Sequence, residues 1–192
     1  MKIIVSAIAD VIPGYAFRSR VTPQPDGNVR VIQMKDIDDR DALQTADLVR
    51  THLSGADQHL RVQEGDLIFR ARGLFHTAAI APAHITDAIV AAPLMLVRVT
   101  DRRVTPSYVR WYINHPKTQV TLSNLAAGSY VRSITKASLA TLEVALPPLD
   151  AQKRIVEIAI LGEREHALMK GISEKRTRLL DEILARFARN TR

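Results

Sequence analysis

The sequence predicts an α+β fold, because short strand-like segments fill most of the chain and one long helical pattern follows them. The 192 residues are 46% hydrophobic and 24% charged, as in an ordinary globular protein. Residues 1–149 are enough to bury one core, and residues 150–192 read as a separate unit. We therefore expect a mixed globular body of several short strands, followed by a long C-terminal helix of the coiled-coil type.

Several apolar segments are expected to form the strands of the body. Residues 29–34 alternate apolar and polar side chains, as a half-buried strand does. Residues 67–69 are wholly apolar and follow the turn Glu64-Gly65-Asp66, so they predict a buried strand. The stretch 36–59 is charged and non-periodic, and it predicts a long loop. The remaining expected strands are 77–81, 88–92, 94–99 and 142–146, with a first strand or helical turn over 3–12.

Two short helices are expected late in the body. Thr105 can cap a helix and Pro106 suits its first position, while Asn114-His115-Pro116 ends it. Residues 118–125 predict a second short helix, and 138–142 have a helix-capping pattern.

Two consecutive prolines, Pro147 and Pro148, separate the body from the final helix. Proline cannot donate a backbone hydrogen bond and pushes the residue before it out of the helical region. Asp150 is the expected N-cap of the helix that follows. At about 1.5 Å per residue, this helix would be roughly 57 Å long. A body of this size cannot cover such a length, so we expect the helix to bind a partner.

Apolar residues recur every three or four positions along this helix and predict one apolar stripe. Polar residues 173–178 interrupt the stripe, and Gly162 and Gly171 each cost about 1 kcal/mol relative to alanine. The helix is therefore marginal alone, and pairing with another helix is favoured over folding back onto the body. The stripe comprises Ile155, Ile158, Leu161, Leu168, Ile172, Leu179, Leu180, Ile183, Leu184 and Phe187.

Composition and motifs restrict the classes of function. The net charge of +7 and the pI of about 10.0 favour a polyanionic partner, most commonly nucleic acid. The absence of cysteine excludes disulfides and thiolate metal sites, and no apolar run approaches the ~20 residues of a membrane span. No catalytic or cofactor-binding motif is present, and the six histidines are scattered. We expect a cytoplasmic, non-catalytic protein without metal or cofactor.

Basic residues in loops and at strand ends are the candidate DNA contacts. The guanidinium fork of arginine matches guanine in the major groove and also pairs with phosphate. Arg70 and Arg72 are favoured because both leave a short, rigid strand, and Tyr130 with Arg132 is expected to contact the DNA backbone. The full set is Arg18, Arg20, Lys35, Arg50, Arg70, Arg72, Tyr130, Arg132 and Lys136.

Five segments together resemble the target recognition domain of type I restriction–modification specificity subunits. They follow the family's order and span essentially the whole chain: 7–17, 31–37, 64–69, 128–136 and 146–156. Ala151 departs from the pattern, because the family often has glutamate there. The departure weakens a local cap contact and leaves the resemblance intact.

The resemblance implies a subunit that reads DNA and carries no catalysis of its own. Residues 1–149 would be a target recognition domain for one half of a split double-stranded DNA site. Residues 150–192 would be a spacer that docks the modification (methyltransferase) subunit, and a restriction subunit can join the assembly. Two alternatives stay open: a regulator of modification subunits that does not read DNA, and an unrecognised DNA-acting enzyme.

The chain has room for one recognition domain, whereas specificity subunits of this family usually contain two. We therefore expect a two-fold homodimer through the C-terminal helices, with the apolar stripe used on both copies. Such a dimer should read a palindromic or nearly palindromic split site.

Overall fold

The computed structural model describes residues 1–53, 58–128 and 132–190. The chain divides into two compact units: Met1–Gln152, the body, and Lys153–Arg192, which continues the last helix. The strands are β1 (Lys2–Ile4), β2 (Ala9–Pro13), β3 (Val29–Ile32), β4 (Val49–Thr51), β5 (Leu67–Arg70), β6 (Ala78–Ile80), β7 (Ala88–Val90), β8 (Leu94–Val99) and β9 (Glu143–Ala145). The helices are α1 (Pro106–Asn114), α2 (Pro116–Leu125), α3 (Lys136–Ala140) and α4 (Leu149–Asn190). Short 3₁₀ turns cover Val5–Ala7, Met34–Asp36 and Gln58–Leu60.

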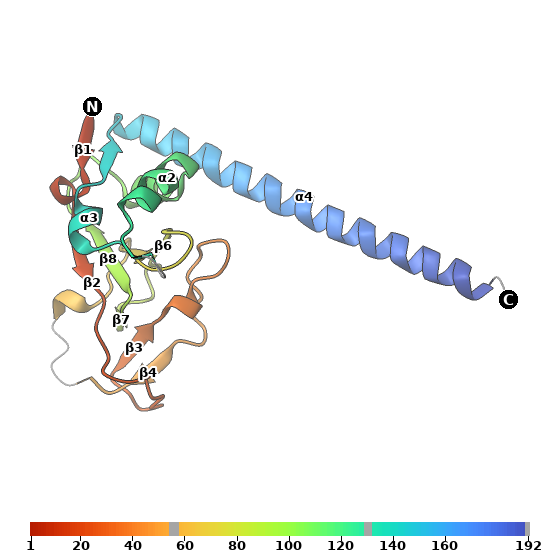
Figure 1. The fold of residues 1–192 in the computed structure, drawn as a ribbon, viewed down its shortest axis with the longest axis horizontal. Coiled ribbons are helices and arrows are strands. Elements are labelled where there is room, and N and C mark those ends of the chain that lie inside the picture. Colours follow the sequence, from red (N-terminus) through yellow and green to blue (C-terminus); the bar gives the residue numbers. More distant parts are fainter. Residues whose placement is uncertain (54–57, 129–131, 191–192) are drawn as a thin grey trace. The chain divides into compact units, whose positions relative to one another are not determined.

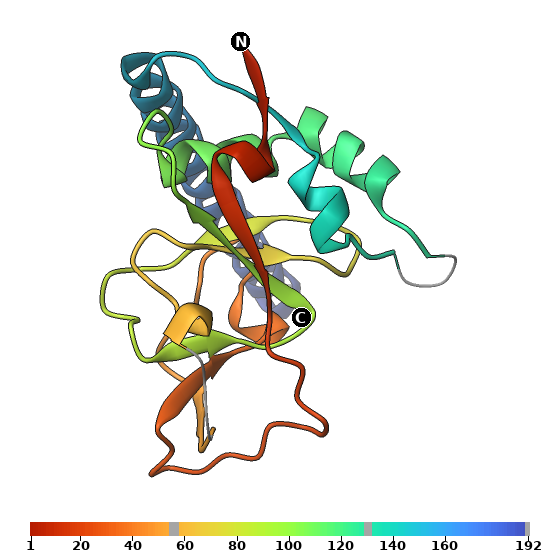
Figure 2. The same ribbon diagram turned by 90° about the vertical axis from the view of Figure 1, so that its left-hand side faces the viewer.

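Within these described residues, the strands pair in three groups (Figure 1). The largest sheet is antiparallel and runs in the order β2-β8-β5-β6. A second sheet has the order β4-β3-β7, with β3 parallel to β7. The pair β1 and β9 brings the beginning and end of the body together, with Lys2 opposite Ala145. The connection from β2 to β3 loops around the end of the body where β3 and β4 lie (Figure 2).

The core lies where the two larger sheets meet. Ile68 of β5, Leu96 of β8 and Ile32 of β3 are fully buried members of one hydrophobic cluster. These segments are rich in Val, Ile and Leu, as expected of strands that bury most of their side chains. Tyr108 attaches α1 to this body, because its buried hydroxyl donates to the carbonyl of Ala145 at 2.8 Å.

The Glu64-Gly65-Asp66 turn holds a buried ion pair beneath β5. Gly65 has a φ of +80°, a conformation that favours glycine. Asp66 is 2% exposed, and its two carboxylate oxygens accept from Arg98 Nε at 2.9 Å and from Nη2 at 2.7 Å. This hydrogen-bonded carboxylate raises the pKa of Arg98. The backbone N–H of Gln63 also donates to Asp66, at 2.8 Å, so the turn closes over a fully paired carboxylate.

The first turn of α4 is attached to the body through Gln152. Its side chain is fully buried and makes three hydrogen bonds to backbone groups. The Gln152 oxygen accepts from the N–H of Thr105 at 3.0 Å. The Gln152 amide donates to the carbonyls of Arg103 at 2.8 Å and Pro147 at 2.9 Å. From this turn α4 continues without a break to Asn190, through both glycines and the polar stretch.

The structure confirms the α+β class, the long final helix and most of the expected elements, and it corrects four details. The stretch expected to be a loop, 36–59, contains β4. The helix α3 begins at Lys136, earlier than expected, because Thr135 caps it by accepting from the N–H of Ser138. The helix α2 begins at Pro116, ahead of the expected residue 118. Asp150 is not the cap of α4, since the helix begins at Leu149 and places Asp150 in its first turn.

Candidate nucleic-acid interface

Separate segments of the body bring basic side chains to the turn Ala92–Pro93. Arg72 lines a pocket of about 370 Å³ beside this turn. Arg20 and Lys35 line a second pocket, of about 530 Å³. Ala92 and Pro93 line both pockets, so the two hollows adjoin. We call the surface formed by Arg20, Lys35 and Arg72 around Ala92–Pro93 the basic face.

The three basic residues of the basic face are surrounded by uncharged residues. Among the described residues, neither pocket has an aspartate or glutamate in its lining. The other lining residues are apolar or uncharged: Pro13, Gly14, Ala16, Phe17, Ser19, Val21, Gln33, Met34, Ala71, Ala91, Leu94, Met95, Ser133 and Ile134. A hollow lined by charges of one sign concentrates ligands of the opposite sign, and here that ligand is an anion.

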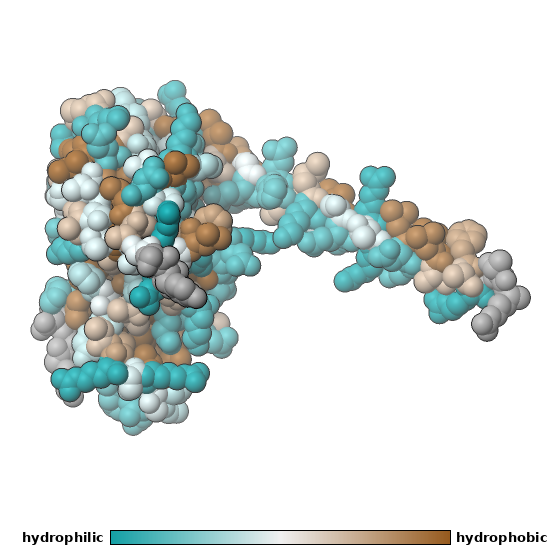
Figure 3. Space-filling view, in the orientation of Figure 1, coloured by the Kyte–Doolittle hydropathy of each residue, from teal (hydrophilic) through white to brown (hydrophobic). Residues whose placement is uncertain are grey.

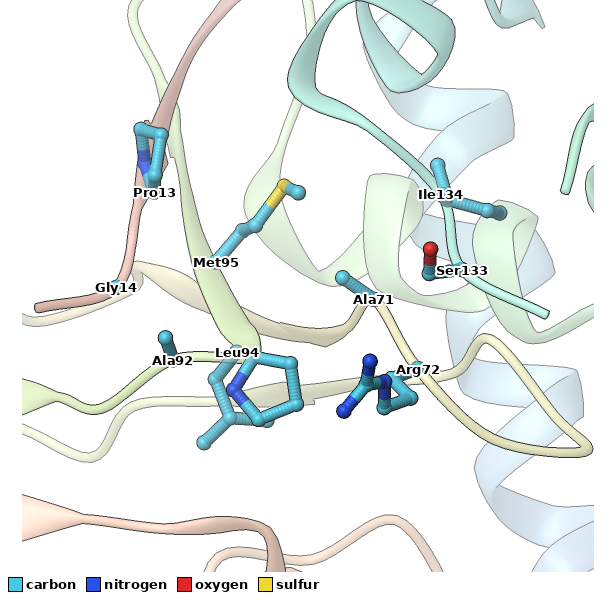
Figure 4. Close-up of a pocket in the computed structure, with 10 residues that line it drawn as sticks. Pro13, Gly14, Ala71, Arg72, Ala92, Leu94, Met95, Ser133 and Ile134 are labelled. Carbon is cyan, nitrogen blue, oxygen red and sulfur yellow. The ribbon is translucent and has the colours of Figure 1, made fainter. Parts of the chain in front are cut away.

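Arg72 is held in place by backbone pairing on both sides. It follows β5 and forms an isolated antiparallel bridge with Ser133, while the carbonyl of Ala71 accepts from the N–H of Ile134 at 2.8 Å. The guanidinium of Arg72 faces the side of the pocket formed by Leu94 (Figure 4). Gly14 lies against Leu94 on this same side, where a Cβ would be 2.5 Å from the Leu94 carbonyl oxygen, so only glycine fits.

Lys35 is presented by a short 3₁₀ turn at the end of β3. Asp36 is 8% exposed, and its carboxylate accepts from the N–H of Gln33 at 2.7 Å, which closes the turn. Burial raises the pKa of Asp36 above its ordinary value. Lys35 itself is exposed, as are Arg18 and Arg20 on the connection between β2 and β3.

The structure places Arg70 away from the basic face. Its Nη2 donates to the carbonyls of Ile37 at 2.6 Å and Asp38 at 2.9 Å, and its side chain is 18% exposed. The guanidinium therefore holds the segment after β3 against β5. We leave Arg70 out of the interface, because its fork is already occupied by protein oxygens.

Arg50 also binds to groups within the body. It donates to the carbonyl of Gly27 at 3.1 Å and to the carboxylate of Asp87 at 3.0 Å. Partial burial acts to raise the pKa of Asp87, but the hydrogen bond from Arg30 and the charges of both arginines outweigh it and lower that pKa. Arg50 is 44% exposed, yet its charge is balanced locally, so we leave it out as well.

The remaining predicted DNA-binding residues lie beside the loop that follows α2. Arg132 is exposed, and its Nη1 donates to the carbonyl and hydroxyl of Ser123 at 3.2 and 3.1 Å. Lys136 is exposed as the first residue of α3. Tyr130 lies outside the described residues. Two features at the interface were not anticipated from the sequence: the Ala92–Pro93 turn, and the exposed pair Leu74 and Phe75 beside Arg72.

The apolar residues of α4 form an exposed stripe. Ile158 is 70% exposed, Leu168 68% and Phe187 69%, whereas Ile155 is partly buried. Apolar surface recurs along the helix between hydrophilic side chains (Figure 3). No helix in the described part of the chain is long and apolar enough to cross a membrane. Nor do the described residues contain a group of three His, Asp or Glu side chains placed to hold a metal ion.

Comparisons with known proteins agree with this architecture. The family model described as the type I restriction modification DNA specificity domain matches residues 6–175, and the chain belongs to this family. No curated protein matches the chain in sequence.

Solved structures of specificity subunits share the fold. The HsdS subunit from Thermoanaerobacter tengcongensis is 20% identical with a TM-score of 0.65, over 88% of this chain and 38% of that one. The S subunit from M. genitalium is 12% identical with a TM-score of 0.57, over 88% of this chain and 41% of that one. A chain from a structure reported on complex assembly and conformational transition of the type I R-M system is 17% identical, with a TM-score of 0.68. The match covers 88% of this chain and 40% of that one. The chain therefore spans well under half the length of these chains.

Proposed function

We propose that this chain is a DNA-reading specificity subunit of a type I restriction–modification system. The body binds one half of a split site through the basic face, with Arg18 at its margin. The observation that carries the proposal is the meeting of Arg20, Lys35 and Arg72, from three separate segments, in adjoining pockets without acidic residues. Membership of the DNA specificity family supports the same conclusion.

The charge of the basic face provides the first test. In the triple variant Arg20→Ala, Lys35→Ala and Arg72→Ala, DNA affinity should fall strongly. Its logarithmic salt dependence should flatten by roughly 0.9 for each DNA phosphate that the variant no longer neutralises. The measurement is fluorescence anisotropy at several salt concentrations, using a duplex that the full chain has selected from a random pool in the presence of a modification subunit.

A matched control removes the same charge elsewhere. Arg102, Lys117 and Lys153 are exposed and do not line the basic face, so their joint replacement by alanine should change affinity much less. Equal reductions of affinity in both triple variants would mean that only net charge matters. That result would argue against a localised interface.

The helix α4 is proposed to supply the surface that binds other subunits. Its stripe of exposed apolar side chains needs a covering surface, since each would otherwise remain in water. We propose that two copies pair through this stripe and that the assembled helices dock the modification subunit, which carries the catalysis; a restriction subunit can join. The complex would act in the cytoplasm, on a palindromic or nearly palindromic site with a fixed gap.

Light scattering tests the proposed homodimer. The full chain should have the mass of two copies at micromolar concentration. Replacing Leu168, Ile172 and Leu179 with glutamine should give a monomer, because it removes the apolar stripe while keeping a good helix former. Glutamine at Lys170, Glu174 and Arg178, which a spacing of about 100° per residue places on the opposite face, should leave the dimer intact. A monomeric full chain would contradict the proposal.

A further inference from the structure

The loop between β5 and β6 carries a small apolar tip beside the basic face. Leu74 is 85% exposed and Phe75 is 61% exposed, although both are large hydrophobic residues. Leu74 is more exposed than any other large hydrophobic residue in the described part of the chain. Single exposed hydrophobic residues are common, but here two large ones are adjacent at a loop tip, which suits them to contact a partner.

The tip is held at both ends, so its two side chains are presented on a fixed base. At the first end, Arg72 bridges Ser133 and the N–H of Gly73 donates to the carbonyl of Arg132 at 3.4 Å. Gly73 has a φ of +131°, which a residue with a side chain would adopt only with strain.

At the second end, the Gln119 side chain holds the backbone of His76. Its oxygen accepts from the His76 N–H at 3.0 Å, and its amide donates to the His76 carbonyl at 3.0 Å. His76 is buried, and this burial lowers the pKa of its imidazole, with the charge of Arg132 acting in the same direction. Both backbone groups of His76 are thus bound by one side chain of α2, which fixes the second end of the tip.

Charge around the tip selects the kind of partner. Arg72 and Arg132 are exposed on the segments that clamp its first end, where they can bind phosphate. Asp39, which is exposed, borders Phe75 in a pocket of about 650 Å³. The same pocket also holds Asp41 and the mostly buried Arg70, so the exposed charge beside Phe75 is that of Asp39, and the exposed positive charge lies at the first end of the tip. A phosphate backbone bound at the arginines of that end would leave the uncharged bases to contact Leu74 and Phe75.

Resting on the DNA-reading function proposed above, we propose that Leu74 and Phe75 form a wedge that enters the base stack of DNA bound at the basic face. Apolar side chains inserted between base steps partly unstack them and kink the duplex. Anchoring at Ser133 and Gln119 lets the wedge keep its orientation while it displaces a base step.

Chemical probing of bound DNA tests the wedge. The full chain is bound to the duplex that it selects from a random pool, and the complex is treated with permanganate for thymine and diethyl pyrocarbonate for purines. Wild-type protein should make bases at one step hyperreactive. The double variant Leu74→Ala and Phe75→Ala should lose this reactivity and bind at least about tenfold more weakly. Val120→Ala is a matched control, because Val120 is an apolar residue 63% exposed outside the tip.

The outcomes separate the wedge from the wider function. Selective binding without hyperreactive bases, or hyperreactivity that survives the double variant, overturns the wedge and leaves DNA reading intact. Selective binding without hyperreactive bases is also the result expected if a protein surface, rather than DNA, covers the tip. Failure of the wild-type chain to select any duplex overturns DNA reading itself. Retention of the signal in Phe75→Tyr and its disappearance in the double variant would support an aromatic wedge.

Discussion

Replacing Asp66 with alanine is expected to lower the free energy of unfolding by about 3–5 kcal/mol, because it leaves a buried guanidinium without its partner. Asp66 is 2% exposed and Arg98 18%, so water cannot fully replace the missing carboxylate. The change also leaves the N–H of Gln63 without its acceptor. Urea unfolding followed by circular dichroism measures the effect.

Two further variants separate the ion pair from the turn. Glu64→Ala lies in the same turn but changes an exposed side chain, so it should cost less than about 0.5 kcal/mol. Replacing both partners, as Asp66→Leu with Arg98→Met, should recover much of the stability, because no unpaired charge remains buried. If Asp66→Ala were as stable as Glu64→Ala, the pair would not be a structural requirement.

Gln152→Leu is expected to cost about 2–4 kcal/mol, since one substitution leaves three partly buried backbone groups without their side-chain partner. Leucine has a similar volume and a high helix propensity, so the effect would come from the missing hydrogen bonds. Thermal and urea unfolding measure it, with Lys153→Leu, at the exposed neighbouring position, as the control. A destabilisation equal to that of the control would show that the amide contributes little.

The elements predicted well are those whose signals are local. The Thr105–Pro106 start of α1 and the wholly apolar run of β5 each depend on neighbours in sequence. The strand β4 was missed because it is short and carries a charged residue, and its stability comes from pairing with β3. Propensity gives no sign of such a partner, since the strand is specified by tertiary structure.

The DNA contacts named from the sequence remain predictions, and the structure adds how three of them are grouped. Arg20, Lys35 and Arg72 were each expected to contact DNA, yet nothing in the sequence shows that the Ala92–Pro93 turn joins their pockets. Arg70 shows how contacts between distant parts of the sequence change such an interpretation. Its carbonyl partners, at Ile37 and Asp38, lie more than thirty positions earlier, so sequence alone could not distinguish it from the exposed Arg72.

The buried amide of Gln152 also determines how α4 can melt. An isolated helix must first form a costly nucleus, with a statistical weight of about 10⁻³. Here the body supplies that nucleus, because Gln152 fixes the first turn through backbone groups outside the helix. The helix therefore grows from residue 149 in one direction and unzips from its far end. In a single copy, residues near Asn190 are expected to open independently of the body, whereas those near Gln152 should open only with the body; pairing of two helices would tie the far end to the dimer as well.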